Sequence, residues 1–481
     1  MVRLGQFELV ESIGKGGMGE VWRARAAKSG QLAAVKIVDL PRAVTVDQRV
    51  LFREVQAMAR LHHPNIAVIW DVGRVDSVAA EKGELPEDAL YLVMELIEGR
   101  DLSSLLGTLS WPKIRAMLLA LLDALAHAHG RQVIHRDLKP ENVLVSQHSE
   151  GGWRPKLVDF GIAHQTPDAS SIAATQEQEL GPMGTPAYMA PEQINGDWRD
   201  HGPWTDLYAL GCMAWELVCG RPPFDADNML LLMNAHLSDP LPDFEPNVAV
   251  PVGFEDWVRR LLQKDWGRRF EWAAGAAAAL LALDDAPMME PVGEPNRRAG
   301  AEDLTEPMLM TRTLPIDELP SGAPSGDAAD LADNDSLEPA VRSTIPATWR
   351  SDDAGSAAGH LLGAGLSLYG LKRIPVIDRS EIRDALWGAL RSVEGERPRR
   401  GIVLDGPAGC GKSRLAEWLV ERAREVGGAY TLRAVHGANS IGGPTVGIEP
   451  MLAEHFGCLD QSCEQAERRV RRAFGRIGLE G

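Results

Sequence analysis

The chain has few cysteines, fewer basic than acidic residues, and no long apolar run. The five cysteines show no metal-ligand spacing, which argues against a zinc site and suits a reducing cytoplasm. Lys and Arg number 50 against 68 Asp and Glu, a net charge of −18, so nucleic acid, which needs a basic face, is not an expected partner. No apolar run is long enough to span a membrane. The N-terminus enters a predicted strand at once and leaves no room for a signal peptide. We therefore expect a cytoplasmic protein without a membrane segment.

A glycine-rich segment lies between two runs of alternating apolar residues, 7–13 and 21–24. Gly14, Gly16 and Gly19 fall in the turn between them, where backbone amides can approach phosphates without a Cβ in the way. The glycine spacing alone would also fit a dinucleotide fold, in which a helix follows. Because Val21 begins a second strand instead, the pattern predicts a strand, a tight turn and a strand.

The strand predicted at residues 33–38 carries Lys36 among apolar neighbours. A lysine is costly to bury without a partner. Residues 52–58 have helical apolar spacing and offer Glu54, which by itself would be read as an ordinary solvated carboxylate. Glu54 follows the strand lysine and precedes the motif at residues 135–142, which is described next. Because of this order we predict an ion pair between Lys36 and Glu54.

Residues 135–142, His-Arg-Asp-Leu-Lys-Pro-Glu-Asn, place Asp137, Lys139 and Asn142 on one predicted loop. Phosphoryl transfer uses this set: a carboxylate for the hydroxyl, a lysine for the moving phosphoryl group and an amide for a metal. Asp159 ends a short strand in Asp-Phe-Gly and is the second oxygen ligand expected for Mg²⁺. An Asx turn with glycine is the alternative reading of Asp159.

These motifs, closed by Ala-Pro-Glu at 190–192, resemble those of Hanks-type protein kinases, in the wording of bacterial Ser/Thr kinases. The resemblance covers residues 5–283 and implies an α+β two-lobed kinase fold, with an N-lobe at 5–97 and a C-lobe at 98–283. It implies ATP- and Mg²⁺-dependent phosphorylation of serine and threonine in protein substrates during bacterial signal transduction. It also allows a dimer for autophosphorylation in trans.

The resemblance assigns roles to individual residues. Lys36 would hold the α- and β-phosphates, Asp137 would be the catalytic base, and Lys139 marks Ser/Thr specificity. Val21 and Ala34 would enclose the adenine. The full set implied for ATP is Ile13, Gly14, Gly16, Gly19, Val21, Ala34, Lys36, Met94 as gatekeeper, and Glu95 and Ile97 of the hinge.

The resemblance also implies supporting contacts. Asp206 would brace the 135–142 loop from a helix, and Glu192 would pair with Arg269, although Arg268 lies beside it. Trp266 stands where the family usually has proline. In the activation segment a phosphorylated hydroxyl would pair with Arg136. The candidates are Thr166, Ser170, Ser171 and Thr175, while Thr185 would contact the region of Asp137.

Residues 284–360 differ in composition from the kinase-like part. From 285 to 360 there are 15 Asp and Glu against 5 Lys and Arg, with nine prolines and one aromatic residue. Such a segment cannot bury enough apolar surface to offset the entropy of ordering. We predict a disordered, extended acidic linker. Its Thr311, Thr313, Ser343 and Thr344 are either ordinary linker hydroxyls or autophosphorylation sites.

Residues 361–481 carry a second nucleotide-binding pattern. A predicted buried strand at 401–405 precedes GxxxxGKS, and helical spacing follows, which is the context of a P-loop. Its residues are Gly406, Gly409, Gly411, Lys412 and Ser413. The segment resembles the start of an AAA-type signal-transduction ATPase. Only about 120 residues are present against about 150 for a closed sheet, so we expect a fragment or an incomplete domain.

Two other functions are weighed against the active kinase. A pseudokinase would lack a catalytic or metal-binding residue, yet Lys36, Asp137, Asn142 and Asp159 are all present. The second alternative is an ATPase switch in which the kinase is accessory.

Overall fold

The computed structural model describes most of the kinase-like part and several segments after it. The described residues are 2–16, 19–38, 55, 57–147, 153–160, 186–196, 198–226, 228–283, 288–289, 345–350, 376, 378–393, 400–435, 447–456, 458 and 462–476.

The N-lobe is built on a six-stranded antiparallel sheet in the order β1-β2-β3-β4-β6-β5. The strands are β1 (Arg3–Leu4), β2 (Phe7–Gly16), β3 (Gly19–Ala26), β4 (Leu32–Val38), β5 (Ile69–Arg74) and β6 (Leu90–Met94), and helix α2 (Ser77–Gly83) follows β5. Side chains alternate between faces along a strand. Val35, Ile37 and Val93 therefore enter one buried cluster, which leaves the opposite face for the polar residues of the site.

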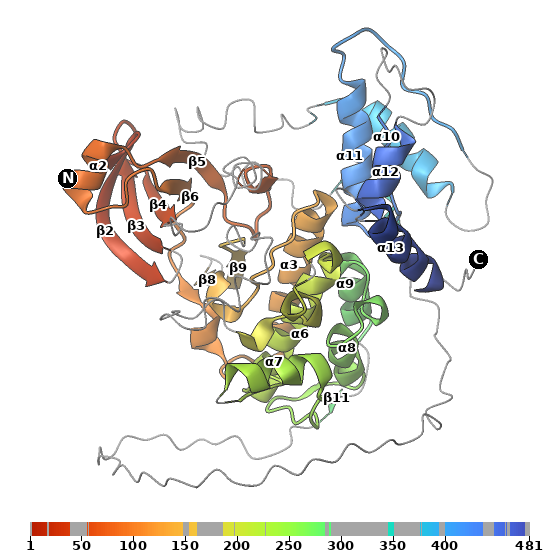
Figure 1. Ribbon diagram of the computed structural model, residues 1–481, viewed down its shortest axis with the longest axis horizontal. Coiled ribbons are helices and arrows are strands. Elements are labelled where there is room, and N and C mark those ends of the chain that lie inside the picture. The colour runs from red at the N-terminus through yellow and green to blue at the C-terminus, as the bar shows by residue number, and fades with distance from the viewer. Residues whose placement is uncertain are drawn as a thin grey trace.

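The C-lobe is helical, with its core around α3 and α6 (Figure 1). Its α-helices are α3 (Trp111–Gly130), α5 (Pro191–Ile194), α6 (Pro203–Cys219), α7 (Met229–Ser238), α8 (Phe254–Leu261) and α9 (Ala273–Leu281). Its 3₁₀ turns are η1 (Leu102–Leu105), η2 (Pro140–Asn142), η4 (Pro186–Tyr188), η5 (Trp198–Asp200) and η6 (Trp266–Arg268). Helix α6 is buried along its whole length except for its first two residues, so it can position side chains rigidly.

Two small sheets complete the C-lobe. Strands β7 (Arg100–Asp101), β8 (Val143–Gln147) and β9 (Trp153–Leu157) form one, and β10 (Val250–Pro251) pairs with β11 (Met288–Met289) in the other. Strands β8 and β9 flank the site, because β8 follows residues 135–142 directly and β9 leads to Asp159. The sheet-based N-lobe and helical C-lobe match the predicted two-lobed kinase fold.

The described part of the C-terminal segment is helical. It contains α10 (Ser380–Arg391), α11 (Lys412–Glu425), α12 (Ile448–His455) and α13 (Cys463–Arg476), and none of its described residues forms a strand. The predicted buried strand at 401–405 is therefore wrong: the run is irregular, and Val403 is 89% exposed. A strand needs neighbours to pair its backbone groups, and the described residues provide none here.

Part of the predicted linker contacts this segment. In residues 345–350, Ile345 is buried and Trp349 packs edge-on against Trp418 of α11, with ring centroids 5.4 Å apart. The carbonyl oxygen of Pro346 accepts a hydrogen bond from Trp387 of α10. Most other residues predicted to form the linker lie outside the described ranges.

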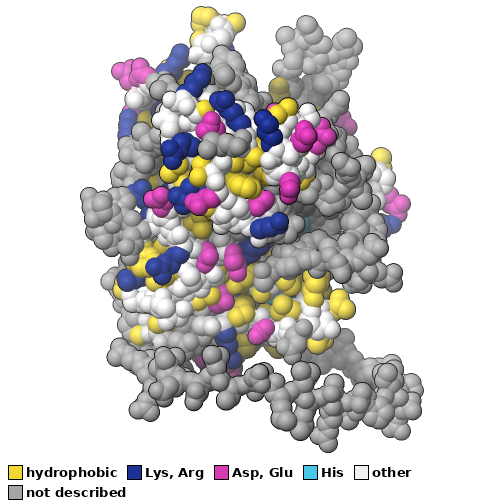
Figure 2. Space-filling view, turned by 90° about the vertical axis from the view of Figure 1, so that its left-hand side faces the viewer, with side chains coloured by type: hydrophobic (Ala, Val, Ile, Leu, Met, Phe, Trp, Pro, Cys, Tyr) yellow, Lys and Arg dark blue, Asp and Glu magenta, His cyan; other side chains and the backbone are white. Residues whose placement is uncertain are grey.

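The described surface carries mixed charge. Figure 2 views the molecule from the N-lobe side and shows lysine and arginine side chains mixed with aspartate and glutamate over this face. Within the described residues, no helix combines the length and the hydropathy needed to cross a membrane.

Candidate active site

Four of the residues predicted to bind ATP share one face of the N-lobe sheet. Val21 of β3 lies opposite Lys36 of β4, and Ala34 of β4 lies opposite Met94 of β6. Lys36 and Ala34 are two residues apart, so their side chains point to the same side. The register thus places Val21, Ala34, Lys36 and Met94 together, on the face opposite the Val35 cluster.

The glycine-rich segment joins two strands, as predicted. Gly14 pairs with Val21 and Gly16 pairs with Gly19, and Ile13 near the end of β2 is 44% exposed. Gly19 has φ +138°, and a Cβ there would lie 1.9 Å from the carbonyl oxygen of Ile37. Only glycine can bring β3 this close to β4 at the start of the strand.

The 135–142 loop brings its three polar side chains together. Lys139 Nζ lies 3.1 Å from Asp137 Oδ2. Asn142 Nδ2 donates to the carbonyl oxygen of Asp137 at 2.7 Å and to its Oδ2 at 2.9 Å. The side chain of Asp137 thus accepts from a cation and from an amide, which fixes the position of its carboxylate.

Helix α6 supports this loop through the side chain of Asp206. The carboxylate of Asp206 accepts backbone hydrogen bonds from His135 and Arg136, both at 2.8 Å, and lies 2.7 Å from His129 Nε2. Burial alone would raise the pKa of Asp206, but the contacts with His129 and His135 lower it, so the brace is anionic. The prediction that Asp206 braces the loop is confirmed. The role of His129 was not predicted, although a histidine in the apolar stretch that forms the end of α3 was a signal for it.

The backbone around this loop is held in an unusual conformation. Arg136 has φ +63° and Asp159 has φ +56°, and positive φ is uncommon outside glycine. Gln193 of α5 donates to the carbonyl oxygen of Arg136 at 2.8 Å. Burial lowers the pKa of His135, whose Nε2 lies 2.9 Å from the carbonyl oxygen of Val158. These contacts hold both strained residues beside the predicted reacting groups.

Lys36 connects the N-lobe to Asp159. Lys36 Nζ lies 2.8 Å from Asp159 Oδ1, and both side chains are mostly buried. Glu54, the predicted partner of Lys36, lies outside the described residues. The backbone N–H of Val158 donates to the carbonyl oxygen of Asn142, which brings Asn142 close to Asp159 in the fold.

The donor set suits a hard cation such as Mg²⁺. Because Asn142 directs its Nδ2 toward Asp137, its amide oxygen is the atom that can serve a metal, together with the carboxylate of Asp159. The described residues hold no cluster of three or more His, Cys, Asp or Glu that could bind a metal unaided. A magnesium ion held by Asn142 and Asp159 would therefore need further oxygens, which nucleotide phosphates supply.

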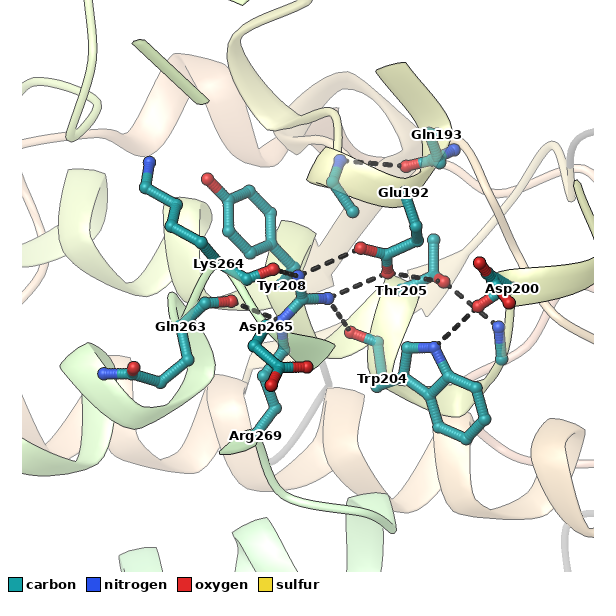
Figure 3. Close-up of polar contacts among 12 residues, drawn as sticks. Glu192, Gln193, Asp200, Trp204, Thr205, Tyr208, Gln263, Lys264, Asp265 and Arg269 are labelled. Carbon is teal, nitrogen blue, oxygen red and sulfur yellow. Dashed lines mark hydrogen bonds and ion pairs between the residues drawn. The ribbon is translucent and has the colours of Figure 1, made fainter. Parts of the chain in front are cut away.

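Glu192 pairs with Arg269 rather than with Arg268 (Figure 3). Arg269 Nη1 and Nη2 donate to Glu192 Oε1 and Oε2 at 2.8 and 3.0 Å, and the guanidinium also donates to the carbonyl oxygens of Gln263 and Trp204. Thr205 donates to Glu192 at 2.9 Å. Trp266, the unusual residue of this region, stacks on Trp204 with ring centroids 4.5 Å apart, so it closes one side of this network.

A contact at the predicted hinge was also missed. Glu95 Oε2 lies 2.9 Å from Lys156 Nζ, and the backbone N–H of Glu95 donates to the carbonyl oxygen of Val68. Lys156 belongs to β9, which leads to Asp159. The pair thus connects the hinge to the strand that carries a predicted metal ligand, and nothing in the sequence marked these two residues as partners.

Several predictions fall on residues that the structure does not describe or describes only in part. The activation-segment residues Thr166, Ser170, Ser171, Thr175 and Thr185 lie outside the described ranges.

In the P-loop pattern, Gly406, Gly409 and Gly411 have φ of +151°, +78° and +91°, and Lys412 and Ser413 begin α11. Lys412 Nζ donates to the carbonyl oxygens of Gly406 and Pro407 at 2.7 and 2.8 Å.

Comparisons with known proteins agree with this geometry. The family model described as "Protein kinase domain" matches residues 7–279. A probable serine/threonine-protein kinase PknB of Bifidobacterium longum is 36% identical over 280 residues, covering 56% of this chain and 38% of that protein. Serine/threonine-protein kinase pkn3 of Myxococcus xanthus is 34% identical over 282 residues, covering 56% of this chain and 49% of that protein.

A third relative aligns over a longer stretch. Serine/threonine-protein kinase PkaA of Streptomyces coelicolor is 36% identical over 362 residues, covering 66% of this chain and 60% of that protein. The chain thus spans between 38% and 60% of the length of these three relatives. The matched family range lies within the predicted residues 5–283 and covers more than half of the chain. With the two-lobed fold and the site between β4, β9 and the 135–142 loop, this match shows that the chain belongs to the protein kinase family.

Proposed function

We propose that this chain transfers the γ-phosphoryl group of ATP to serine and threonine hydroxyls of protein substrates, with Mg²⁺, in bacterial signal transduction. The observation that carries the proposal is the presence of two polar clusters, joined by the hydrogen bond from the backbone N–H of Val158 to the carbonyl oxygen of Asn142. Lys36 and Asp159 meet at 2.8 Å, and Asp137, Lys139 and Asn142 meet within 3.1 Å. The names of the relatives, all serine/threonine-protein kinases, support the same class.

The chemistry assigned to each residue follows from its charge and position. Asp137, fixed by Lys139 and Asn142, accepts the proton of the substrate hydroxyl and orients it. Lys139 lies beside that carboxylate and balances negative charge on the moving phosphoryl group. Lys36 holds the phosphates from the N-lobe, where Gly14, Gly16 and Gly19 offer backbone amides. Asn142 and Asp159 would hold a magnesium ion, which would neutralise charge on the phosphates.

The test is Asp137→Asn in the full chain. The amide cannot accept the hydroxyl proton as a carboxylate does, so we expect incorporation of ³²P from ATP to fall on the order of 10³-fold. Asp88→Asn is the matched control, because its side chain is 67% exposed and asparagine tolerates the positive φ of this position. Control activity should equal wild type. Retained activity in Asp137→Asn would refute the role of Asp137, and phosphotyrosine as the main product would refute the Ser/Thr assignment.

We propose that a phosphate in the activation segment controls this activity. The candidates are Thr166, Ser170, Ser171 and Thr175, with Arg136 as the cationic partner and Thr185 as a contact near Asp137. Phosphorylation adds about −1.5 to −2 of charge, which an arginine beside the catalytic Asp can pair. Mass spectrometry of active protein tests this: fully active enzyme with no phosphate between residues 160 and 192 would exclude it.

The second candidate function is a nucleotide-driven ATPase switch at Gly406–Ser413. The positive φ of three glycines and the helix that starts at Lys412 favour a phosphate-binding turn. Among the described residues after 376, no strand is found that would build the sheet of an AAA-type domain. Lys412→Ala should therefore leave phosphorylation of a generic protein substrate within about twofold of wild type. A larger loss of kinase activity would favour the switch.

A further inference from the structure

Helix α11 lies against the C-terminal end of α3, although the two helices are far apart in the sequence (Figure 1). The two backbones approach closely at Gly130, the last residue of α3. A Cβ at this position would lie 2.9 Å from the carbonyl oxygen of Glu421 and 3.2 Å from the backbone nitrogen of Glu425. The α3 end therefore needs glycine where the α11 backbone passes.

A buried carboxylate anchors α11 at the same place. Glu425 is only 11% exposed, and its oxygens lie 3.1 Å from His127 Nδ1 and 3.4 Å from Arg131 Nη1. His127 Nε2 accepts from the backbone N–H of His62, so the proton of the neutral ring is on Nδ1 and is donated to Glu425. Burial lowers the pKa of His127 to about 4, in agreement with a neutral ring.

The negative charge of Glu425 is stabilised by its neighbours, although the dipole of its own helix opposes it. Glu425 is the last residue of α11, where the helix dipole disfavours a carboxylate. Burial alone would raise its pKa, but the hydrogen bond from His127 and the charges of Arg131 and Arg422 hold it well below the ordinary value. A buried anion at this end of a helix is stabilised by Arg131, the residue after α3, and by Arg422.

Two further contacts join the same parts of the chain. Arg469 of α13 lies 2.7 Å from Asp200 of η5 and donates to the carbonyl oxygen of Arg199. The ring of Tyr430 meets Trp272 edge-on, with centroids 5.8 Å apart. The C-terminal segment therefore contacts the C-lobe at three separate points, through α11, Tyr430 and α13.

We propose that the surface formed by His127, Gly130 and Arg131 is a docking site for helix α11 of the same chain. The segment after the acidic linker is then bound to the C-lobe instead of being tethered freely. The docking site ends at Arg131, four residues before His135, and the intervening His129 contacts Asp206, the brace of the 135–142 loop. Docking therefore stabilises the stretch that leads into the site. This proposal does not depend on the proposed function, because it concerns binding between two parts of the chain.

The test uses the full chain with a site-specific protease sequence introduced within residues 305–335. After cleavage, we expect the C-terminal piece to co-elute with the kinase lobe in gel filtration. Gly130→Ala should weaken this association at least about tenfold, because the added Cβ meets the α11 backbone. Glu425→Gln should weaken it by a similar factor, because Arg131 loses its charged partner.

Each variant has a matched control. Gly275 lies in helix α9, where a Cβ would meet no atom within 4 Å, so Gly275→Ala should leave the pieces associated. Glu464 is 75% exposed on α13, so Glu464→Gln should also leave them associated. Separation of the pieces in the unsubstituted chain would overturn the proposal. The proposal would also be overturned if the two pieces associated equally well in Gly130→Ala and Gly275→Ala and if Glu425→Gln did not weaken their association.

Discussion

At the scale of single residues, the contact between Glu95 and Lys156 is informative because it ties the hinge to the strand that leads to Asp159. Both side chains are partly buried, at 26% and 12% exposure. We expect the double-mutant cycle of Glu95→Gln and Lys156→Gln to give a coupling of about 1 kcal/mol in chemical denaturation, with a several-fold rise in the KM for ATP. The exposed pair Arg221 and Glu245 is the control, with expected coupling near zero. Equal coupling in the two cycles would contradict a special role for the hinge pair.

At the scale of elements, Glu192 and Arg269 join α5 to the turn after α8. The ion pair is bidentate and almost fully buried. Because Arg269→Ala leaves the Glu192 carboxylate buried without its cation, it should lower the free energy of unfolding by about 3–5 kcal/mol, as measured by urea denaturation. Arg269→Lys should recover only part, because an ammonium group cannot match both oxygens. Arg268 precedes it and is exposed, so Arg268→Ala should change stability by less than about 0.5 kcal/mol. A large loss on Arg268→Ala would mean that the arginine pairing is misassigned.

At the scale of the whole molecule, buried histidines should make folding sensitive to acid. Burial and the nearby charge of Lys264 lower the pKa of His236 to about 4, and burial lowers that of His127 to about 4. The unfolded chain then binds more protons between about pH 4 and 6.5, so stability is complete above that window and falls as pH drops through it. In this pH window, His236→Gln should reduce the slope of the free energy of unfolding against pH by up to about 1.4 kcal/mol per pH unit.

The measurement is chemical denaturation at several pH values between 4.5 and 7.5. His455→Gln is the control, because this side chain is exposed on α12 and should leave the slope unchanged. An unchanged slope in His236→Gln would show that His236 takes up protons equally in the folded and unfolded chain.

The sequence by itself determined the local chemistry of this protein. Asp137, Lys139 and Asn142 lie within six residues on one loop, so their proximity follows from chain connectivity. The alternation around Lys36 and Gly19 was enough to predict the strands that carry them, because strand periodicity is local. The brace by Asp206 followed from the family resemblance.

Tertiary structure decided the pairings between distant segments. Only packing placed Lys36 against Asp159, selected Arg269 over Arg268 for Glu192, and joined Glu95 to Lys156. It also overturned the strand predicted at residues 401–405, because a strand depends on neighbours that its own sequence does not specify. The contact of Glu425 with His127 joins residues 298 positions apart, and no periodicity in either helix encodes such a partner.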